Sequence, residues 1–367
     1  YINYNQKFTP NNFDIFDPID KLEIKVDGKV LESPNFIMTK EDYSKYREKT
    51  DKFTFNNFYL WSKKEKDIYP NLKSLDKMNR EVYKNQEKIP KIPNNNQDLY
   101  YINQGIKYID KHFKNNLGNT DNFIYPCTHK TAKKWMRKFL KYKLKYFGPY
   151  QDYIKTDDIY MFHSVLSSSM NIGLLNPNDV IKELDKYKNS TPINSFEGYL
   201  RQLFWREYQR YTYIYIDFFK YKYFKNNKKL DSRWYTGNLK IEPIDDLIKI
   251  GVDTGYMNHI GRLMFIGNWM TLYGLKPIEG YKWFMEFSCD SYEWVMHQNV
   301  LDMVFFVSGG VTMRKPYISS SNYILNMSDY KKGDWSDKWD ELYTNFLKKN
   351  KEKLWKFRYH FRNLQQL

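Results

Sequence analysis

Apolar residues return every three or four positions through most of the second half of the chain, which is the period of an α-helix with one buried face. The pattern predicts helices over 178–188, 195–224, 244–250, 257–273, 277–287 and 336–355. Breaks between them are predicted at Pro192, Gly237, Gly274 and the pair Gly309-Gly310. We therefore expect an all-α domain after residue 150. No internal repeat or sustained heptad favours a solenoid or a coiled coil.

One stretch alternates apolar and charged residues as a β-strand does. Residues 19–38 alternate around Asp27 and Gly28, which is typical of a β-hairpin with a tight turn. The sequence from Lys40 to Tyr150 is polar. Prolines and a run of asparagines in it indicate a loop between helical segments. We expect three parts: 1–35 with the hairpin, a long connector over 36–149, and a helical domain over 150–367.

The charge of the chain points to a polyanionic partner. Lys and Arg total 59 against 43 Asp and Glu, so the net charge is +16. This balance favours nucleic acid or an anionic membrane surface, and the sign alone does not choose between them. Residues 128–147 space aromatic residues at helical intervals with lysines between them, which predicts an amphipathic basic helix whose charged face is solvated. No apolar run of about 18 residues suggests a transmembrane helix.

Two cysteines, Cys127 and Cys289, are too few for a disulfide framework. A reducing, intracellular compartment is the simpler interpretation. They are also too few for the four thiolates that an iron–sulfur cluster normally needs. The chain opens with Tyr1, which is compatible with a fragment of a longer protein. It shows no secretory signal pattern.

Two segments carry candidate chemistry before residue 210. The serine-rich turn over 163–174 offers hydroxyls and backbone N–H groups that can hold a phosphate, although a capped turn has the same appearance. On a helix, Arg201, Trp205 and Tyr208 share one face. That face suits stacking on an extruded base beside phosphates, and the alternative is a packed Trp between solvated arginines.

A third segment places polar residues on an apolar helix. The segment 255–269 is mostly apolar, but it contains the polar residues His259, Arg262 and Asn268. An arginine buried without a partner costs several kcal/mol, so a carboxylate or a bound anion should lie opposite. Asp290 can supply that charge. His259 taken alone is also compatible with an ordinary core histidine.

The order and spacing of these segments resemble the flavin domain of photolyases and cryptochromes. The similarity is densest from about 150 to 330 and rests on the serine-rich turn, Trp205-Arg206-Glu207, Trp234-Tyr235-Thr236-Gly237, His259 with Arg262, and Asp290. Four phrases are similar to the bacterial photolyase-related group, the iron–sulfur (6-4) photolyases: 163–177, 292–295, 315–317 and 327–330.

The resemblance implies a mainly α fold, a helical FAD-binding domain of photolyase/cryptochrome type preceded by a remnant of an α/β (Rossmann-like) antenna domain. It also implies light-driven, FAD-dependent repair of pyrimidine dimers in DNA, with the (6-4) photoproduct as the first candidate. Most of the antenna domain is missing from the chain, which speaks against a bound antenna pigment and leaves room for a separate chain that supplies the domain. No membrane partner is expected.

The same resemblance assigns roles residue by residue. The cofactor-binding residues are Tyr150, His163, Ser164, Leu166, Ser167, Arg206, Arg262, Asn268 and Asp290. The catalytic positions are His259, in the lesion pocket, with Asn258 and Met296. The electron-relay residues are Trp283, Tyr235 and Trp234. The DNA-binding residues are Arg201, Trp205, Arg314 and Lys315, with Arg206 in the Trp-Arg pair of the DNA-facing helix.

The chain departs from the group at several of these positions. Lys331-Lys332-Gly333-Asp334 stands where the cluster cysteines are usual, so we expect no iron–sulfur cluster and no metal. Asn258-His259 keeps one histidine of a usual pair, Phe284 replaces a relay tyrosine, and Met296 lies opposite flavin N5, where a polar residue is common. These departures leave two alternatives to repair: a cryptochrome-like blue-light photoreceptor, and a degenerate nucleic-acid-binding relative without flavin.

Overall fold

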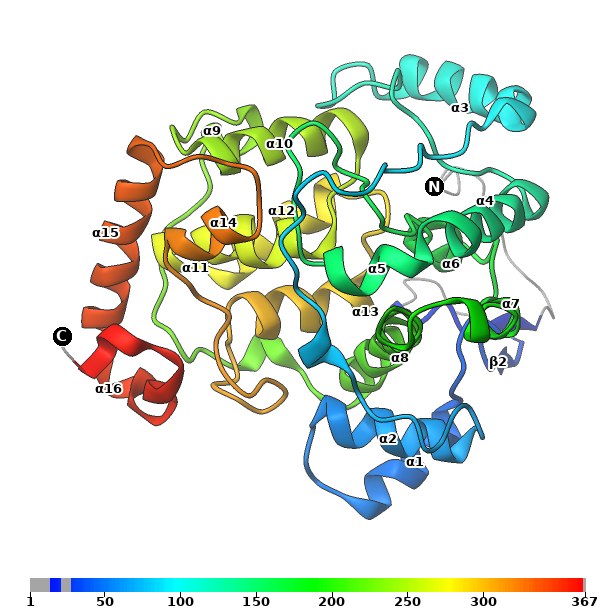
Figure 1. Ribbon diagram of the computed structural model, residues 1–367, viewed down its shortest axis with the longest axis horizontal. Coiled ribbons are helices and arrows are strands. Elements are labelled where there is room, and N and C mark those ends of the chain that lie inside the picture. The colour runs from blue at the N-terminus through cyan, green and yellow to red at the C-terminus, as the bar shows by residue number, and fades with distance from the viewer. Residues whose placement is uncertain (1–13, 21–27, 366–367) are drawn as a thin grey trace.

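The computed structural model describes residues 14–20 and 28–365. Helices dominate this part of the chain (Figure 1), and the mainly α fold predicted from the sequence is confirmed. In the first 215 residues the α-helices are α1 (Lys40–Lys49), α2 (Phe55–Glu65), α3 (Leu99–His112), α4 (His129–Tyr142), α5 (Leu144–Tyr150), α6 (Ser167–Asn171), α7 (Pro177–Asp185) and α8 (Ile193–Tyr215).

The second half continues with short helices and two π-helical turns. They are α9 (Arg233–Thr236), α10 (Glu242–Thr254), the π-helix η5 (Gly261–Gly267), α11 (Asn268–Tyr273), α12 (Pro277–Phe287), α13 (Glu293–Met296), the π-helix η6 (His297–Val304), α14 (Ser321–Asn326), α15 (Asp334–Lys349) and α16 (Lys351–Leu354). Single 3₁₀ turns are η1 (Asp76–Met78), η2 (Asn96–Asp98), η3 (Lys188–Ser190), η4 (Phe218–Lys220), η7 (Trp355–His360) and η8 (Arg362–Gln365).

The hairpin predicted over 19–38 stays a prediction, because residues 21–27 lie outside the described part of the chain. Strand β2 (Val30–Leu31) pairs with β1 (Ile15–Phe16), and the pairing is parallel. A hairpin requires antiparallel neighbours, whereas a parallel pair needs a long crossover connection. Asp27 and the predicted first strand lie outside the described residues. The pair of short parallel strands is consistent with a remnant of an α/β domain.

The long helix α8 organises the first of two hydrophobic cores. Its buried side chains pack with those of α1, α2, α4 and α5, and the cluster runs from Ile37 to Tyr256. Leu200, Phe204 and Tyr208 on α8 have no exposed surface. Residues from both sides of position 150 therefore share one core.

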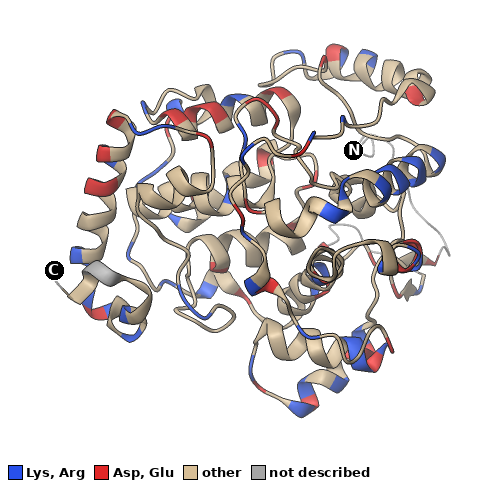
Figure 2. Ribbon diagram, in the orientation of Figure 1, with Lys and Arg blue, Asp and Glu red and all other residues tan. Residues whose placement is uncertain are grey.

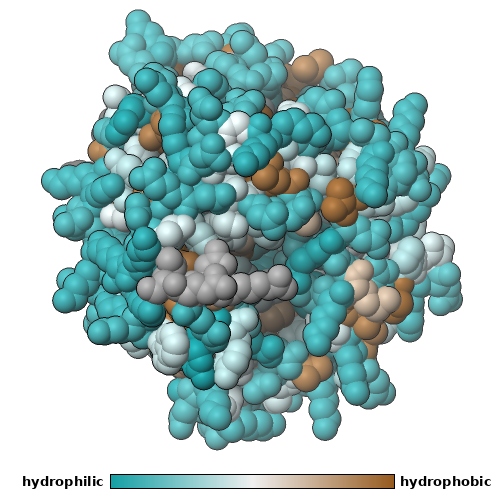
Figure 3. Space-filling view, turned by 60° about the vertical axis from the view of Figure 1, so that its left-hand side comes forward, coloured by the Kyte–Doolittle hydropathy of each residue, from teal (hydrophilic) through white to brown (hydrophobic). Residues whose placement is uncertain are grey.

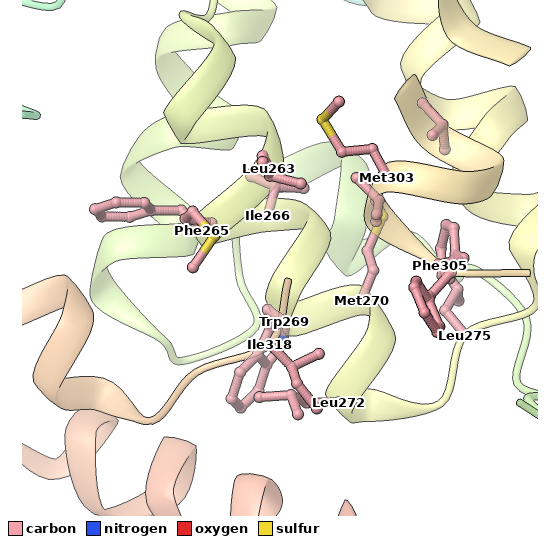
Figure 4. Packing of buried hydrophobic residues seen from close by; sticks show 14 of the residues in the cluster. Leu263, Phe265, Ile266, Trp269, Met270, Leu272, Leu275, Met303, Phe305 and Ile318 are labelled. Atoms are coloured by element: carbon pink, nitrogen blue, oxygen red, sulfur yellow. The ribbon is translucent and has the colours of Figure 1, made fainter. Parts of the chain in front are cut away.

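The second core lies between η5, α11, α12, η6 and α15. Figure 4 shows Trp269 close to Leu272 and Ile318, and Met270 pointing toward Phe305 and Leu275. A Cβ at Gly280 would lie 2.4 Å from the ring of Phe305, so glycine lets α12 approach this cluster. This packing fixes η5, the helix that carries Arg262.

Helix boundaries follow the predicted pattern best where a proline opens the helix. Pro177 and Pro277 occupy the first position of α7 and α12, where the missing N–H costs nothing. Helix α12 has the predicted bounds of 277 and 287. Helix α8 ends at Tyr215 and not at 224, because Ile216 is extended and the Asp217 side chain caps the 3₁₀ turn η4.

The surface is mostly hydrophilic, with apolar residues in small separate patches on the face seen in Figure 3. Among the described residues, no helix combines the length and apolarity that crossing a membrane requires. A hollow of about 680 Å³ lies between α3 and the segment 113–123. No predicted site residue lines it.

Candidate functional site

One hydrogen-bonded network joins two of the sequence-predicted segments. Arg262 Nη2 donates to Asp290 Oδ1 over 2.8 Å, and Ser167 Oγ donates to Asp290 Oδ2 over 2.7 Å. Each carboxylate oxygen therefore has its own donor. The carboxylate that Arg262 requires is Asp290, as the sequence predicts.

The network is largely shielded from water. The side chains of Arg262 and Asp290 retain 13% and 12% of their exposed surface. Arg262 Nε also donates to the carbonyl of Met257 over 2.7 Å, while its Nη1 has no hydrogen-bond partner within the described ranges. One guanidinium edge is thus held in place by the protein and one nitrogen is left to meet a further acceptor.

Asn171 extends the network toward α8. Its Nδ2 donates to the Asp290 carbonyl over 3.0 Å, and its Oδ1 accepts from Arg206 Nε over 3.4 Å. Arg206 Nη1 in turn donates to the carbonyl of Asn35 over 2.6 Å. The N-terminal segment, α6, α8 and the loop before α13 meet at this point. Asn171 has no assigned role in the sequence analysis, although it lies inside the serine-rich phrase.

His259 lies beside this network. Its imidazole is exposed to solvent, yet the surrounding protein desolvates it. Desolvation and the positive charges of Arg262 and His163 lower the pKa of His259 to about 4. At neutral pH the imidazole is uncharged and can donate or accept a proton.

Cys289 adds a thiol beside the Arg262–Asp290 pair. The residue is exposed, and its nearest charges are Asp290 and Arg262. Burial of the surrounding region and the negative charge of Asp290 raise the pKa of the Cys289 thiol to about 12. The Tyr125 hydroxyl, from the connector, interacts with this thiol. No sequence signal indicates that Tyr125 reaches the site.

The turn before α6 is held by long-range contacts. Val165 has a left-handed φ of 54°, which is costly for a β-branched residue. Trp135 Nε1 donates to the Ser164 carbonyl over 3.0 Å, and Leu166 is fully buried. These contacts offset the strain of the turn and orient Ser167 toward Asp290.

His163 and Tyr150 brace the approach to this turn. His163 places Nε2 3.0 Å from the Gln151 carbonyl and Nδ1 3.2 Å from the Tyr160 carbonyl. The Tyr150 hydroxyl accepts from Gln86 Nε2 over 2.5 Å, and its ring packs in a separate small cluster. Their predicted contacts with a cofactor stay predictions.

Asn258 opens the helix that carries Arg262. Its side chain is buried, and Oδ1 accepts from the Gly261 N–H over 2.8 Å. This bond satisfies a free backbone donor at the helix start, as a capping residue does. Met296 is buried in the second core at the end of α13. Among the described residues, neither Asn258 nor Met296 has a charged partner. Their catalytic roles stay predictions.

Asn268, which the sequence assigns to the cofactor, lies in a buried hydrogen-bonded position, and its cofactor role stays a prediction. The residue has no exposed surface. Nδ2 donates to the Met264 carbonyl over 3.2 Å and to Ser319 Oγ over 2.9 Å, and Oδ1 accepts from the Ser319 N–H over 3.3 Å. These bonds tie α11 to the segment before α14.

Much of the helix face that carries Arg201 and Trp205 is covered in this structure, and the predicted DNA-binding roles of these two residues stay predictions. The Arg201 guanidinium is buried and pairs with Asp76 at 2.8 Å and Glu197 at 3.4 Å. The Trp205 ring stacks on Phe55, with centroids 3.7 Å apart. Tyr208 has no exposed surface. Helix α2 and the connector cover this face, and no local sequence pattern indicates that cover.

Arg206 faces inward as well. Its guanidinium is buried, lies 4.3 Å over the ring of Phe36, and bonds the Asn35 carbonyl. Burial lowers the pKa of Arg206 to about 10. It therefore anchors the N-terminal segment, and its predicted contacts with a cofactor and DNA stay predictions. Of the predicted DNA-binding residues, Arg314 is exposed and Lys315 is half-buried.

The three relay residues lie on α9 and α12, which the structure brings together. Trp283 Nε1 donates to the Trp234 carbonyl over 2.9 Å, and both indoles are buried. The Tyr235 hydroxyl donates to Glu286 over 2.8 Å. Phe284 meets Trp283 edge to face at 5.0 Å. The contacts establish adjacency, and electron transfer along them stays a prediction.

Comparison with known proteins agrees with the motifs. The model of the family "Deoxyribodipyrimidine photo-lyase-related protein" matches residues 8–125. A (6-4) photolyase of Agrobacterium fabrum is 34% identical over 264 residues, which are 68% of this chain and 52% of that protein. An uncharacterized protein of Acanthamoeba polyphaga mimivirus is 54% identical over 91 residues, 24% of this chain and 74% of that one.

A solved structure of a bacterial class III photolyase from Agrobacterium tumefaciens aligns with a TM-score of 0.47 at 16% identity, over 65% of this chain and 46% of that chain. The sequence relatives define a member of the photolyase and cryptochrome superfamily. Within it, the chain belongs to the deoxyribodipyrimidine photo-lyase-related family. The family predicted from the motifs is confirmed. The chain spans about half the length of the (6-4) photolyase that it matches.

Proposed function

We propose that the chain binds FAD at the network of Ser167, Arg262 and Asp290 and takes part in light-driven repair of pyrimidine dimers in DNA, with the (6-4) photoproduct as the favoured substrate. The observation that carries the proposal is the meeting of Ser167, Arg262 and Asp290 in one shielded network. The similarity to a named (6-4) photolyase supports the choice of lesion.

The residues present fit the cofactor. The buried hydroxyls of Ser168 and Ser169 lack hydrogen-bond partners in the part of the chain that the structure describes, so the turn has donors for phosphate oxygens. Ser164 and Ser167 belong to the same turn. Arg262, held by Asp290, would meet the polar edge of the isoalloxazine ring through Nη1. When bound, FAD supplies the light-driven electron transfer that repair requires.

The protein's own contribution is to hold and orient the cofactor and the DNA. Asp290 keeps Arg262 in place and balances its charge inside the shielded region. His259 would stand in the lesion pocket as a neutral imidazole able to pass a proton to or from the damaged base. Exposed Arg314 and half-buried Lys315 would meet DNA phosphates.

The first experiment is an absorption spectrum of the purified chain, alone and after addition of FAD. A flavin spectrum that disappears in Arg262→Ala, with Arg233→Ala as an exposed arginine control, supports the site. Repair is then measured on DNA that contains one (6-4) photoproduct or one cyclobutane dimer. His259→Ala should abolish repair of the (6-4) photoproduct while flavin stays bound; unchanged repair would remove His259 from the mechanism.

A second candidate is a blue-light receptor without repair activity. The observation that favours it is Phe284, a side chain that is not readily oxidised, packed against Trp283 in the buried pair of α12. A chain that binds flavin and responds to light, yet repairs neither lesion, would support this candidate. A chain that refuses FAD would instead support a degenerate nucleic-acid-binding relative.

A further inference from the structure

Helix α4 presents a continuous basic face to solvent. Its exposed side chains include six cations at helical spacing, and Figure 2 shows them following one another along the helix: Lys130, Lys133, Lys134, Arg137, Lys138 and Lys141. At 100° per residue these six positions fall on one side of the helix. The opposite side holds the buried residues Ala132, Trp135, Met136, Phe139 and Leu140.

The lack of acidic residues distinguishes this face from the other charged helices. Residues 122–151 contain no Asp or Glu. Helices α1, α7, α10 and α15 each carry at least three acidic residues among their basic ones. Within the described ranges, Arg137 alone of the six cations has an acidic partner, Glu183 at 3.4 Å. Compositional bias toward lysine explains abundant lysine, but not the exclusion of acids from this one surface.

The helix is a firm support for such a face. Thr128 and Thr131 close a capping box at its start, and Trp135 Nε1 is bonded to the Ser164 carbonyl. Because that indole packs under the serine-rich turn, the basic face points away from the Arg262–Asp290 site. From Lys130 to Lys141 the helix rises about 16 Å. That length matches about five phosphates of one DNA strand, at about 3.4 Å per phosphate along the duplex axis.

We infer that the exposed face of α4 is a second nucleic-acid surface, which binds the phosphate backbone of duplex DNA without reading its sequence. The cations lie on a rigid scaffold, face solvent and are spaced to follow a polyanion, while neighbouring carboxylates are absent from their segment. Such a surface would hold intact DNA independently of the lesion pocket. It requires neither flavin nor the residues of the candidate site.

The test compares two charge reversals of equal size. One variant combines Lys133→Glu, Lys134→Glu and Lys138→Glu on α4. The control combines Lys222→Glu, Lys225→Glu and Lys229→Glu, three exposed lysines of the loop between η4 and α9. Binding to an undamaged 20-base-pair duplex is followed by fluorescence anisotropy between about 50 and 200 mM salt.

The α4 variant should lose at least about tenfold in affinity, and its salt slope should fall by about 0.9 for each lost phosphate contact. The control should change affinity less than about threefold. Equal losses in both variants would mean that net charge alone drives binding and would overturn the inference. An unchanged DNA affinity of the α4 variant would also overturn it. So would an α4 variant that keeps its affinity for DNA and loses binding only to vesicles that contain phosphatidylserine. Flavin content is recorded for each variant, so failure of the cofactor site is seen separately.

Discussion

Ser167 and Asp290, which lie 123 positions apart in the chain, share a hydrogen bond of 2.7 Å. Through this bond the turn before α6 and the loop before α13 become two sides of one site. The same carboxylate holds Arg262, so loss of any one of the three side chains removes at least one hydrogen bond from this shielded network.

Replacing Arg262 by Met should lower the free energy of unfolding by about 3 kcal/mol, because it removes one partner of a shielded ion pair and leaves Asp290 without its cation. The double variant Arg262→Met/Asp290→Leu should be more stable than that single variant. Urea unfolding of the four members of the cycle measures the coupling. The matched control is Arg233→Met, in the exposed pair with Asp231, which should leave the midpoint unchanged. Additive single effects would contradict a coupled pair.

His259 should make the stability of the protein depend on pH. Its pKa is about 4 in the folded chain and about 6.5 when unfolded, so the unfolded chain binds more protons between these values. Stability should therefore be complete above pH 6.5 and fall as the pH is lowered toward 4. Thermal unfolding between pH 4 and 7.5 measures the slope. His259→Gln should flatten it and His129→Gln, on the exposed end of α4, should not; equal slopes in all three proteins would rule out His259 as the source.

Asn268→Ala should destabilise the fold by about 2 kcal/mol and leave flavin affinity unchanged. The amide is fully buried and its loss leaves Ser319 without its partner. Chemical unfolding gives the first quantity and titration with FAD the second. If the variant keeps its stability but loses flavin, the cofactor role expected from the sequence would be right after all.

Phe284→Tyr should speed light-driven reduction of bound flavin, provided that the relay runs through Trp283. The two rings are already in contact, and a phenol is more readily oxidised than a phenyl group. Phe287→Tyr is the matched control, because Phe287 also packs on Trp283, with centroids 4.3 Å apart. The reduction rate under blue light is followed by absorption. Equal rates in wild type and Phe284→Tyr would sink the relay assignment.

The features that follow from the sequence are those with a local or chemical cause. Pro277 and the apolar period define α12 to the residue. An arginine at position 262 of an apolar segment predicts a carboxylate partner, and Asp290 is that partner. The family motifs locate the serine-rich turn, whose hydroxyl at Ser167 completes the network.

The features that the sequence does not reveal depend on distant parts of the chain. Arg201 and Trp205 share a helix face as predicted, but Asp76 and Phe55 of the connector cover it. Alternating residues near Gly28 indicate a hairpin, and no spacing indicates the parallel pairing of Val30 with Ile15. The polar Asn268 lies on an apolar helix, where its amide bonds Ser319. No spacing in the sequence indicates this contact.

The shared core of α1, α2, α4, α5 and α8 limits how the protein can be cut. A chain that starts at residue 150 would expose Phe196, Phe204 and Tyr208, whose rings now contact Tyr69, Tyr59 and Phe58 in that order. Limited proteolysis in the loops of the connector should therefore yield fragments that stay associated until they are denatured. A minimal version of the protein for spectroscopy or engineering has to begin ahead of α1.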